Sequence, residues 1–284
     1  AFYMVSTTMH LSPGCPVMKS YDLVNWEIVN YVFDTLEDSD KLALRNGENN
    51  YGKGQWATTL RYNDGVYYAG FTSFSTGKTY IYHTDDIENG KWDRFVYDEC
   101  FHDMSLLFDD DGKVYLIYGG GEIWCVELEK DLSAVKPGTK RKLINNAGLV
   151  KGCLAEGSHV YKLNGYYYIF IITWPPNSKR TQLCYRSEAL DGEWERKVII
   201  RDNMGFRNDG AAQGGIVDDK DGNWYCFVFQ DHGAVGRTPV VSTMTWEDGW
   251  PVVGVNGKVP TTDKIPIAGH EKKGIVTSDE FINS

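Results

Sequence analysis

The sequence predicts an all-β chain folded as a five-bladed β-propeller. The main observation is a repeated pattern, in which an Asn-Gly or Asp-Gly pair is followed at once by an aromatic-rich apolar strand. The turn glycines of four copies lie 47, 53 and 57 positions apart, at Gly65, Gly112, Gly165 and Gly222. Each pair suits a tight hairpin turn, because glycine and asparagine accept a positive φ. Residues 2–5 look like the tail of a fifth copy that lacks its turn.

A second recurring element supports the same architecture. In most copies a strand and a short turn lead to a tryptophan before another apolar strand, at Trp26, Trp92, Trp194 and Trp246. The third copy is aberrant, because Trp124 precedes its turn. An ordinary β-sandwich would fit the strand spacing but not this turn-to-tryptophan repeat. We therefore assign residues 1–254 to the propeller, and residues 255–284 to an exit strand and a linker.

Composition narrows the classes of partner. The 284 residues are 42% hydrophobic, enough for a large core, and 29 basic against 39 acidic side chains give a net charge of −10. A negative chain argues against a nucleic-acid partner, which binds a basic surface. No apolar run of about 18 residues is present, so we predict no spanning helix and no membrane partner. The 14% aromatic content, together with many carboxylates, is typical of sugar-binding proteins.

The six cysteines are spread along the chain without a CxxC pair, so the spacing of a zinc site is absent. We interpret them as reduced, structural thiols rather than the disulfides of a secreted chain, which favours a cytoplasmic location. The opening residues read as the middle of a strand, without a charged leader. We expect chain to be missing at both ends, and the sequence leaves the compartment and the oligomeric state open.

Two carboxylates are the strongest catalytic candidates. A propeller gathers its functional groups in a funnel at one end of the axis, near the entrance of the inner strand of each blade. Asp103 stands at such an entrance beside His102, and Glu156 is a lone acid among apolar and small residues at the next. Burial there would raise the pKa of Glu156 and keep it protonated, as a general acid requires. The alternatives are a strand-capping role for Asp103 and a satisfied structural role for Glu156.

Several other residues are candidates for substrate binding. Trp56 precedes an aromatic strand and is either core filler or a platform for a sugar, whereas Trp174 and Phe206 stand in loop-like sequence. Small residues surround Gln213 and follow Asp231 and His232, which suits the close approach of a ligand or ion. His232 is the candidate metal ligand, although a lone histidine more often has a structural role. With no serine elbow, phosphate loop or HExxH motif present, two carboxylates favour glycoside hydrolysis.

Four stretches together resemble glycoside hydrolase family 43, and the resemblance covers nearly the whole chain. They are residues 102–115 (HDMSLLFDDDGKVY), 156–162 (EGSHVYK), 213–218 (QGGIVD) and 229–237 (FQDHGAVGR). The resemblance implies a five-bladed propeller that hydrolyses β-xylosides or α-L-arabinofuranosides with inversion. The sequences of these four stretches are similar to those of family members that carry a β-sandwich after the propeller. The linker would therefore lead to such a domain.

The resemblance also implies roles for single residues. Glu156 matches the general acid of the family, and Asp103 matches the carboxylate that orients the acid and tunes its pKa. Arg237 matches an arginine that holds the sugar, and Trp56 an aromatic of the sugar pocket. We also expect His102, Trp174, Phe206 and Gln213 to bind substrate. The general base of the family precedes the first aromatic strand, so we expect it upstream of this chain.

The resemblance implies no required cofactor, but it suggests a structural calcium ion on the propeller axis. Some family members hold such an ion near a histidine. The position before Gln213 is Ala212 here, which leaves His232 as the substitute.

The sequence therefore predicts an inverting exo-glycosidase that releases xylose or arabinose from xylo- or arabino-oligosaccharides. Two alternatives stay open. One is an endo-acting, arabinanase-like enzyme of the same fold, and the other is a propeller that binds carbohydrate without cleaving it.

Overall fold

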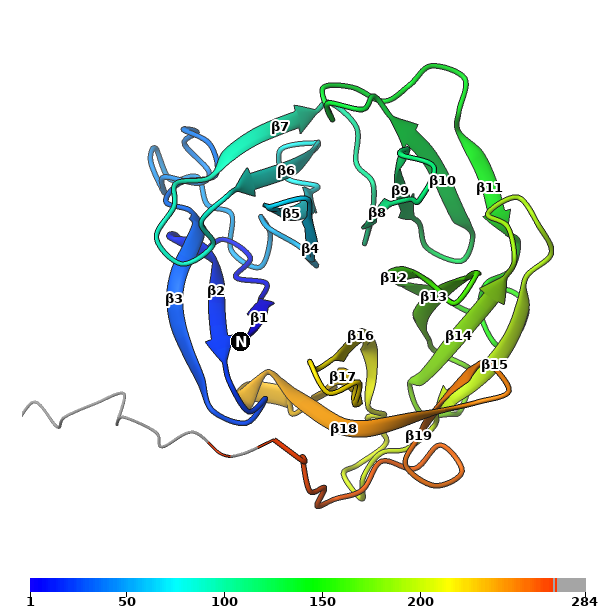
Figure 1. Cartoon of the computed structure of the whole chain (residues 1–284). Helices are drawn as coiled ribbons and strands as arrows, with labels where there is room; N and C mark the ends of the chain where they lie inside the picture. The colour runs from blue at the N-terminus through cyan, green and yellow to red at the C-terminus, as the bar shows by residue number, and fades with distance from the viewer. Residues whose placement is uncertain (268, 270–284) are drawn as a thin grey trace, which may run out of the picture.

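The computed structural model describes residues 1–267 and residue 269. Figure 1 shows small sheets arranged as blades in a ring around a central axis, which confirms the predicted five-bladed propeller. The first blade has three strands and each of the other four blades has four. Strands that follow one another within a blade pair antiparallel throughout. Apart from one short 3-10 helix, Gly233–Val235, the described elements are all strands.

The strands that lie nearest the axis in Figure 1 begin each blade. Blade one consists of β1 (Phe2–Val5), β2 (Gly14–Ser20) and β3 (Trp26–Phe33). Blade two consists of β4 (Thr59–Asn63), β5 (Val66–Ser73), β6 (Lys78–Thr84) and β7 (Asp93–Tyr97). Blade three consists of β8 (Ser105–Phe108), β9 (Val114–Tyr118), β10 (Ile123–Leu128) and β11 (Arg141–Ile144).

The last two blades are also four-stranded. Blade four consists of β12 (Ala155–Leu163), β13 (Tyr166–Thr173), β14 (Thr181–Ser187) and β15 (Glu195–Ile200). Blade five consists of β16 (Ala212–Asp218), β17 (Trp224–Asp231), β18 (Arg237–Glu247) and β19 (Trp250–Val253). Within residues 1–267 and residue 269, no helix is long and apolar enough to cross a membrane.

The repeated turn glycines join the two inner strands of blades two to five, as predicted. Gly65 and Gly165 have φ values of 86° and 82°, and the residues before them, Asp64 and Asn164, also have positive φ. Two consecutive positive φ angles give a turn whose twist matches that of the flanking strands. The tryptophan repeat mostly leads to the outermost strand, but in blade five Trp246 lies within β18 and Trp250 begins β19.

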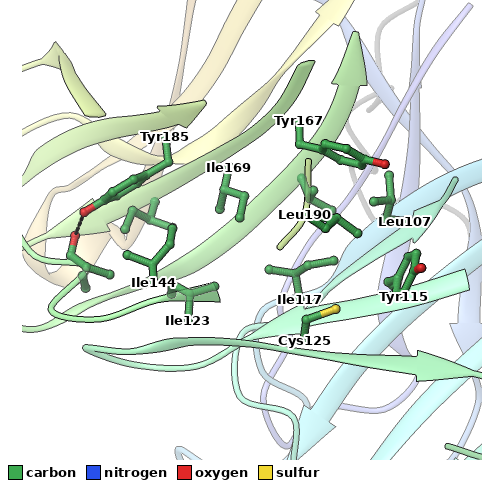
Figure 2. Close-up of a cluster of buried hydrophobic side chains, with 14 of the residues drawn as sticks. Leu107, Tyr115, Ile117, Ile123, Cys125, Ile144, Tyr167, Ile169, Tyr185 and Leu190 are labelled. Atoms are coloured by element: carbon green, nitrogen blue, oxygen red, sulfur yellow. Dashed lines mark hydrogen bonds between the residues drawn. The ribbon is translucent and has the colours of Figure 1, made fainter. Parts of the chain in front are cut away.

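The core lies between neighbouring blades rather than in one central mass. Figure 2 shows the cluster between blades three and four, where Ile117, Ile123 and Cys125 face Ile169 and Tyr185. The Tyr185 hydroxyl donates a hydrogen bond to a backbone carbonyl oxygen at 2.8 Å, so its polar end is satisfied within an apolar interface. Each blade thus buries both faces against its neighbours, and the ring holds the inner strands in fixed positions.

The six cysteines are all free thiols, as the sequence predicts, and Cys15, Cys125, Cys184 and Cys226 are buried. After β19, Val255 and Lys258 form an isolated bridge, and no strand follows in the described residues. Asp263 accepts a 2.8 Å hydrogen bond from the backbone N–H of Thr243, which ties this segment to β18. The remainder of the predicted linker, residues 268 and 270–284, lies outside the described residues.

Candidate active site

A backbone irregularity recurs where the chain enters the inner strands of three blades. In β12 the register shifts between Glu156 and His159, and in β16 it shifts between Ala212 and Gly215. Two residues then face one across the ladder, which is a β-bulge that redirects the neighbouring side chains. Asp103, Gly157 and Gln213 occupy these entrances with φ values of 47°, 73° and 63°. The repeated kink turns the entrance side chains of blades three, four and five toward one another.

The kinks bring His102, Asp103 and Glu156 into one cluster. One imidazole nitrogen and one oxygen from each carboxylate all lie within 4.8 Å of one another. His102 Nε2 lies 2.8 Å from Glu156 Oε2. Asp103 Oδ2 accepts a 3.4 Å hydrogen bond from Gln213 Nε2, and its carboxylate also accepts one from the backbone N–H of Gly157. Four of the predicted site residues, from three blades, are therefore in direct contact.

The neighbours His102 and Asp103 both have raised pKa values, but the main cause differs between them. Asp103 is 6% exposed, and burial raises its pKa from the ordinary 3.8 to about 6, against the opposing charges of His102 and Arg237. The hydrogen bond with Glu156 raises the pKa of His102, and burial of the ring opposes this rise. The pKa values of the Asp103 carboxyl and of the His102 imidazole are thus both raised within one cluster.

The surroundings of Glu156 differ from those that the sequence predicts. We expected an apolar pocket, but the side chain is 20% exposed and is hydrogen-bonded to His102. The sequence places small and apolar residues beside Glu156 along the chain, whereas its partner comes from another blade, 54 positions away. Chain neighbours therefore did not indicate what the carboxyl faces.

The spacing of the two carboxylates limits what they can do together. An inverting glycosidase needs roughly 6.5–9.5 Å between its acid and its base to admit the attacking water. Asp103 and Glu156 have oxygens within 4.8 Å of each other, which leaves no room for that water. Asp103 is thus placed to act on Glu156 and not to serve as the base opposite to it.

A metal ion fits this cluster poorly. Two of the three donor atoms, His102 Nε2 and Glu156 Oε2, are already hydrogen-bonded to each other. A cation would have to displace the hydrogen that lies between these two atoms. The contact is that of a hydrogen-bonded pair rather than of two metal ligands.

Aromatic side chains line one side of the cluster. Phe74, in the turn between β5 and β6, packs against His102 with ring centroids 5.4 Å apart. Trp56 meets Phe74 edge-on at 6.1 Å. Phe74 is 52% exposed, so a large apolar ring faces solvent next to the carboxylates. Phe74 was not predicted from the sequence, although its position in the short turn directly after β5 was a usable signal.

Two arginines and a tryptophan, Arg237, Arg180 and Trp174, are connected to the carboxylate cluster through ionic contacts. Arg237 is close enough for its charge to lower the pKa of Asp103, and its guanidinium lies 3.5 Å from Asp231. Asp231 also forms an ion pair with Arg180, which stacks over Trp174 with 5.6 Å between the guanidinium carbon and the ring centroid. Trp174 is linked to the cluster through these ion pairs, and its backbone N–H also donates a 3.2 Å hydrogen bond to the carbonyl oxygen of Leu154, two residues before Glu156.

Phe206 and His232 form a separate pair. Their rings stack with centroids 4.1 Å apart, and His232 Nε2 lies 3.0 Å from Gln230 Oε1. Both residues line a cavity of about 490 Å³ against β18 and residues 260–265, and none of its lining residues belongs to the carboxylate cluster. The structure therefore does not bring these two predicted site residues to the carboxylates.

Arg61 of β4 links the inner strands of neighbouring blades by hydrogen bonds. Its Nη2 donates to Ser105 Oγ at 2.9 Å and to the carbonyl oxygen of Val160 at 3.0 Å. Its guanidinium stacks on Tyr161 at 5.0 Å, and the Tyr161 hydroxyl accepts a hydrogen bond from the backbone N–H of Ile216. One side chain thus joins blades two, three and four directly and reaches blade five through Tyr161. The sequence analysis did not single out Arg61, because its partners are far away in the chain.

The residues around Arg61, on the inner strands, do not fit the calcium ion that the resemblance suggests. Calcium takes six to eight oxygen ligands. The guanidinium of Arg61 is a cation beside the buried His159, whose pKa is lowered to about 3 by burial and by that charge. A Cβ on Gly215 would lie 2.0 Å from the Tyr161 hydroxyl, so the space is already filled. We derive no step that involves calcium.

Comparison with known proteins identifies the family. A family model described as glycosyl hydrolases family 43 matches residues 1–251. The chain belongs to this family. The match covers all five blades of the propeller apart from the end of β19.

Individual relatives agree with this assignment. The chain is 28% identical to a "Beta-xylosidase" of Formosa agariphila, over 99% of this chain and 52% of the relative. It is 30% identical to a "Xylosidase/arabinosidase" of Butyrivibrio fibrisolvens, over 99% of this chain and 58% of the relative. A solved structure titled "Bifunctional GH43-CE" from Bacteroides eggerthii has 47% identity and a TM-score of 0.89, covering 96% of this chain and 35% of that one. The chain therefore spans about half the length of these curated relatives.

Proposed function

We propose that the protein is an inverting exo-glycosidase that releases xylose or arabinose from xylan-derived oligosaccharides. The observation that carries this proposal is the cluster of Glu156, Asp103 and His102 at the strand entrances of a family 43 propeller. The names of the relatives, a β-xylosidase and a xylosidase/arabinosidase, support the two sugars. Family 43 enzymes are inverting glycosidases, which supports a single displacement.

In this proposal Glu156 is the general acid. It donates its proton to the glycosidic oxygen while the bond between that oxygen and the sugar breaks. A base outside the cluster takes a proton from the water that attacks the opposite face of the sugar. Asp103 holds its negative charge beside Glu156 and disfavours a second ionised carboxylate there.

The aromatic and cationic groups around the cluster would hold the sugar. The exposed ring of Phe74 and the neighbouring Trp56 form an apolar wall on which a pyranose or furanose face can pack. Arg237, 54% exposed beside Asp103, offers hydrogen-bond donors to sugar hydroxyls. We place Gln213 behind Asp103 as a residue that fixes the carboxylate rather than one that meets the substrate.

The test is hydrolysis of 4-nitrophenyl β-xyloside and 4-nitrophenyl α-L-arabinofuranoside by the complete protein. We expect Glu156→Gln to abolish cleavage of whichever substrate is used. Glu195→Gln is the matched control, because Glu195 is an exposed residue on the outermost strand of the same blade. NMR of the first product formed should show the inverted anomer. Equal activity of the wild type and Glu156→Gln would refute the acid assignment, and a retained anomer would refute inversion.

A further inference from the structure

Both ring nitrogens of His102 face carboxylates. Nε2 lies 2.8 Å from Glu156 Oε2, whereas Nδ1 lies 3.8 Å from Asp103 Oδ1, too far for a hydrogen bond. Nδ1 is buried and has no hydrogen-bond partner among the described residues. The ring thus stands between the two acids and is bonded to only one of them.

The position of the ring is fixed by its neighbours. The Phe74 ring packs on one side of it. Gly120 lies beside the ring, and a Cβ there would be in ordinary van der Waals contact with His102 Cδ2, at 3.7 Å. The backbone N–H of Gly119 donates a 2.9 Å hydrogen bond to the His102 carbonyl oxygen. This packing fixes the ring where it meets Glu156.

The contact between His102 and Glu156 requires a proton. Two hydrogen-bond acceptors do not approach to 2.8 Å, so at least one hydrogen lies between Nε2 and Oε2. The proton sits either on the carboxyl, with a neutral imidazole accepting it, or on the imidazole, with a carboxylate accepting it. The charged groups that act on this pair are Asp103 on the same segment and, through Asp103, Arg237 of β18.

We propose that His102 and Glu156 share one proton, so that the proton delivered to the substrate belongs to the pair rather than to Glu156 alone, and that His102 is the positioning residue of the acid. The role in turnover rests on the proposed glycosidase function, but the shared proton does not. A glutamate alone ordinarily loses its proton near pH 4.3, whereas the pair keeps one until the imidazole loses it. The raised pKa of His102 extends that range upward.

The step balances without any further reactant. The shared proton passes to the glycosidic oxygen, which also receives the electron pair of the breaking bond to the sugar. Glu156 is then a carboxylate facing a neutral His102. Uptake of one proton from solvent by the pair restores the starting state.

The first experiment measures kcat/KM against pH for the wild type, His102→Gln and His102→Phe in the complete protein. Glutamine can hydrogen-bond to Glu156 but cannot titrate. We expect both variants to move the alkaline limb of the profile toward acid by at least about one pH unit, which is a tenfold loss on that limb. We also expect His102→Gln to keep more activity than His102→Phe on the acid side. His83→Gln, on β6 of blade two, is the control.

A wild-type alkaline limb in His102→Gln would overturn the proposal, because the proton would then not depend on the imidazole. A drop of equal size at every pH in both variants would also overturn it and would indicate a merely structural role.

The second experiment does not depend on turnover. The ring nitrogens of the six histidines can be followed by ¹⁵N NMR across pH, with His102 assigned from the spectrum of His102→Gln. We expect Glu156→Gln to lower the pKa of His102, because the largest cause that raises it is lost. An unchanged titration would refute the shared proton. If the wild type cleaves neither substrate but this shift is found, the glycosidase proposal fails while the pairing stands.

Discussion

Replacing Asp103 by asparagine removes a buried charge and leaves the backbone undisturbed. Asp103 has a φ of 47°, a left-handed conformation that aspartate and asparagine tolerate better than most other residues. The asparagine oxygen can accept the hydrogen bond from the Gly157 backbone, as the carboxylate does. The change therefore tests the electrostatics of one group with little alteration of its packing.

The sign and size of the effect follow from the pKa of Asp103. Burial raises it from 3.8 to about 6, so between these values the folded protein binds more protons than the unfolded chain. Stability then falls as pH rises through this window, and the full penalty is present above it. The shift corresponds to about 3 kcal/mol. An asparagine side chain cannot ionise, so Asp103→Asn should be more stable by up to about 3 kcal/mol above pH 7, with the difference vanishing below pH 4.

The assay is thermal unfolding of the wild type and Asp103→Asn from pH 4 to pH 8, with activity measured alongside. At pH 8 we expect the Tm of the variant to be higher by roughly 6 °C. We also expect kcat to be lower by about tenfold or more, because the charge beside the acid is gone. Asp109→Asn is the control, since Asp109 is also buried but pairs with Lys162 at 2.6 Å and should lose stability. A variant that is less stable than the wild type at pH 8, or equally stabilised at pH 4, would refute the reasoning.

Three further predictions concern Arg61, Phe74 and the calcium ion. Arg61→Met removes the hydrogen bonds to Ser105 and Val160 and should lower the free energy of unfolding by about 3–5 kcal/mol; a Tm within about 2 °C of the wild type would count against this role of Arg61. Phe74→Ala should raise KM roughly three- to tenfold, since stacking is worth about 0.5–1.5 kcal/mol; an unchanged KM would remove Phe74 from the substrate site. EDTA should leave the Tm unchanged, and a rise of several degrees on adding calcium would show that the residues around Arg61, or another site, bind the ion after all.

Local sequence signals were sufficient for the architecture. The Asn-Gly and Asp-Gly pairs mark hairpins because the two-residue turns need positive φ, and Asp64-Gly65 and Asn164-Gly165 adopt it. Their spacing indicates the blades because blades two to five each begin with a hairpin that contains such a pair, whereas residues 6–13 join β1 to β2 in blade one. The tryptophans were a weaker guide, since Trp124 and Trp246 lie within strands rather than before them.

The candidate site was predictable only in part. Asp103 and Glu156 could be named because both stand where an apolar strand begins, and the fold places such points around one axis. The partner of Glu156 could not be named from its chain neighbours, because His102 reaches it across blades. Phe74 and Arg61 were missed for the same reason, since each acts on residues of other strands. Phe206 was expected at the site as a large ring in loop-like sequence, and His232 because small residues follow it, but the two stack on each other in a separate cavity.

The sequence by itself determined the repeat, the turns and the strands, because these depend on residues within a few positions of one another. It also determined the family, through motifs between residues 102 and 237, and the family model matches residues 1–251. Only the tertiary structure decided the ionisation of the site. Ring closure buries Asp103, sets His102 against Glu156 and packs Arg61 beneath them. A pKa depends on burial and on charges a few ångströms away, and such distances are fixed by the packing of blades rather than by order along the chain.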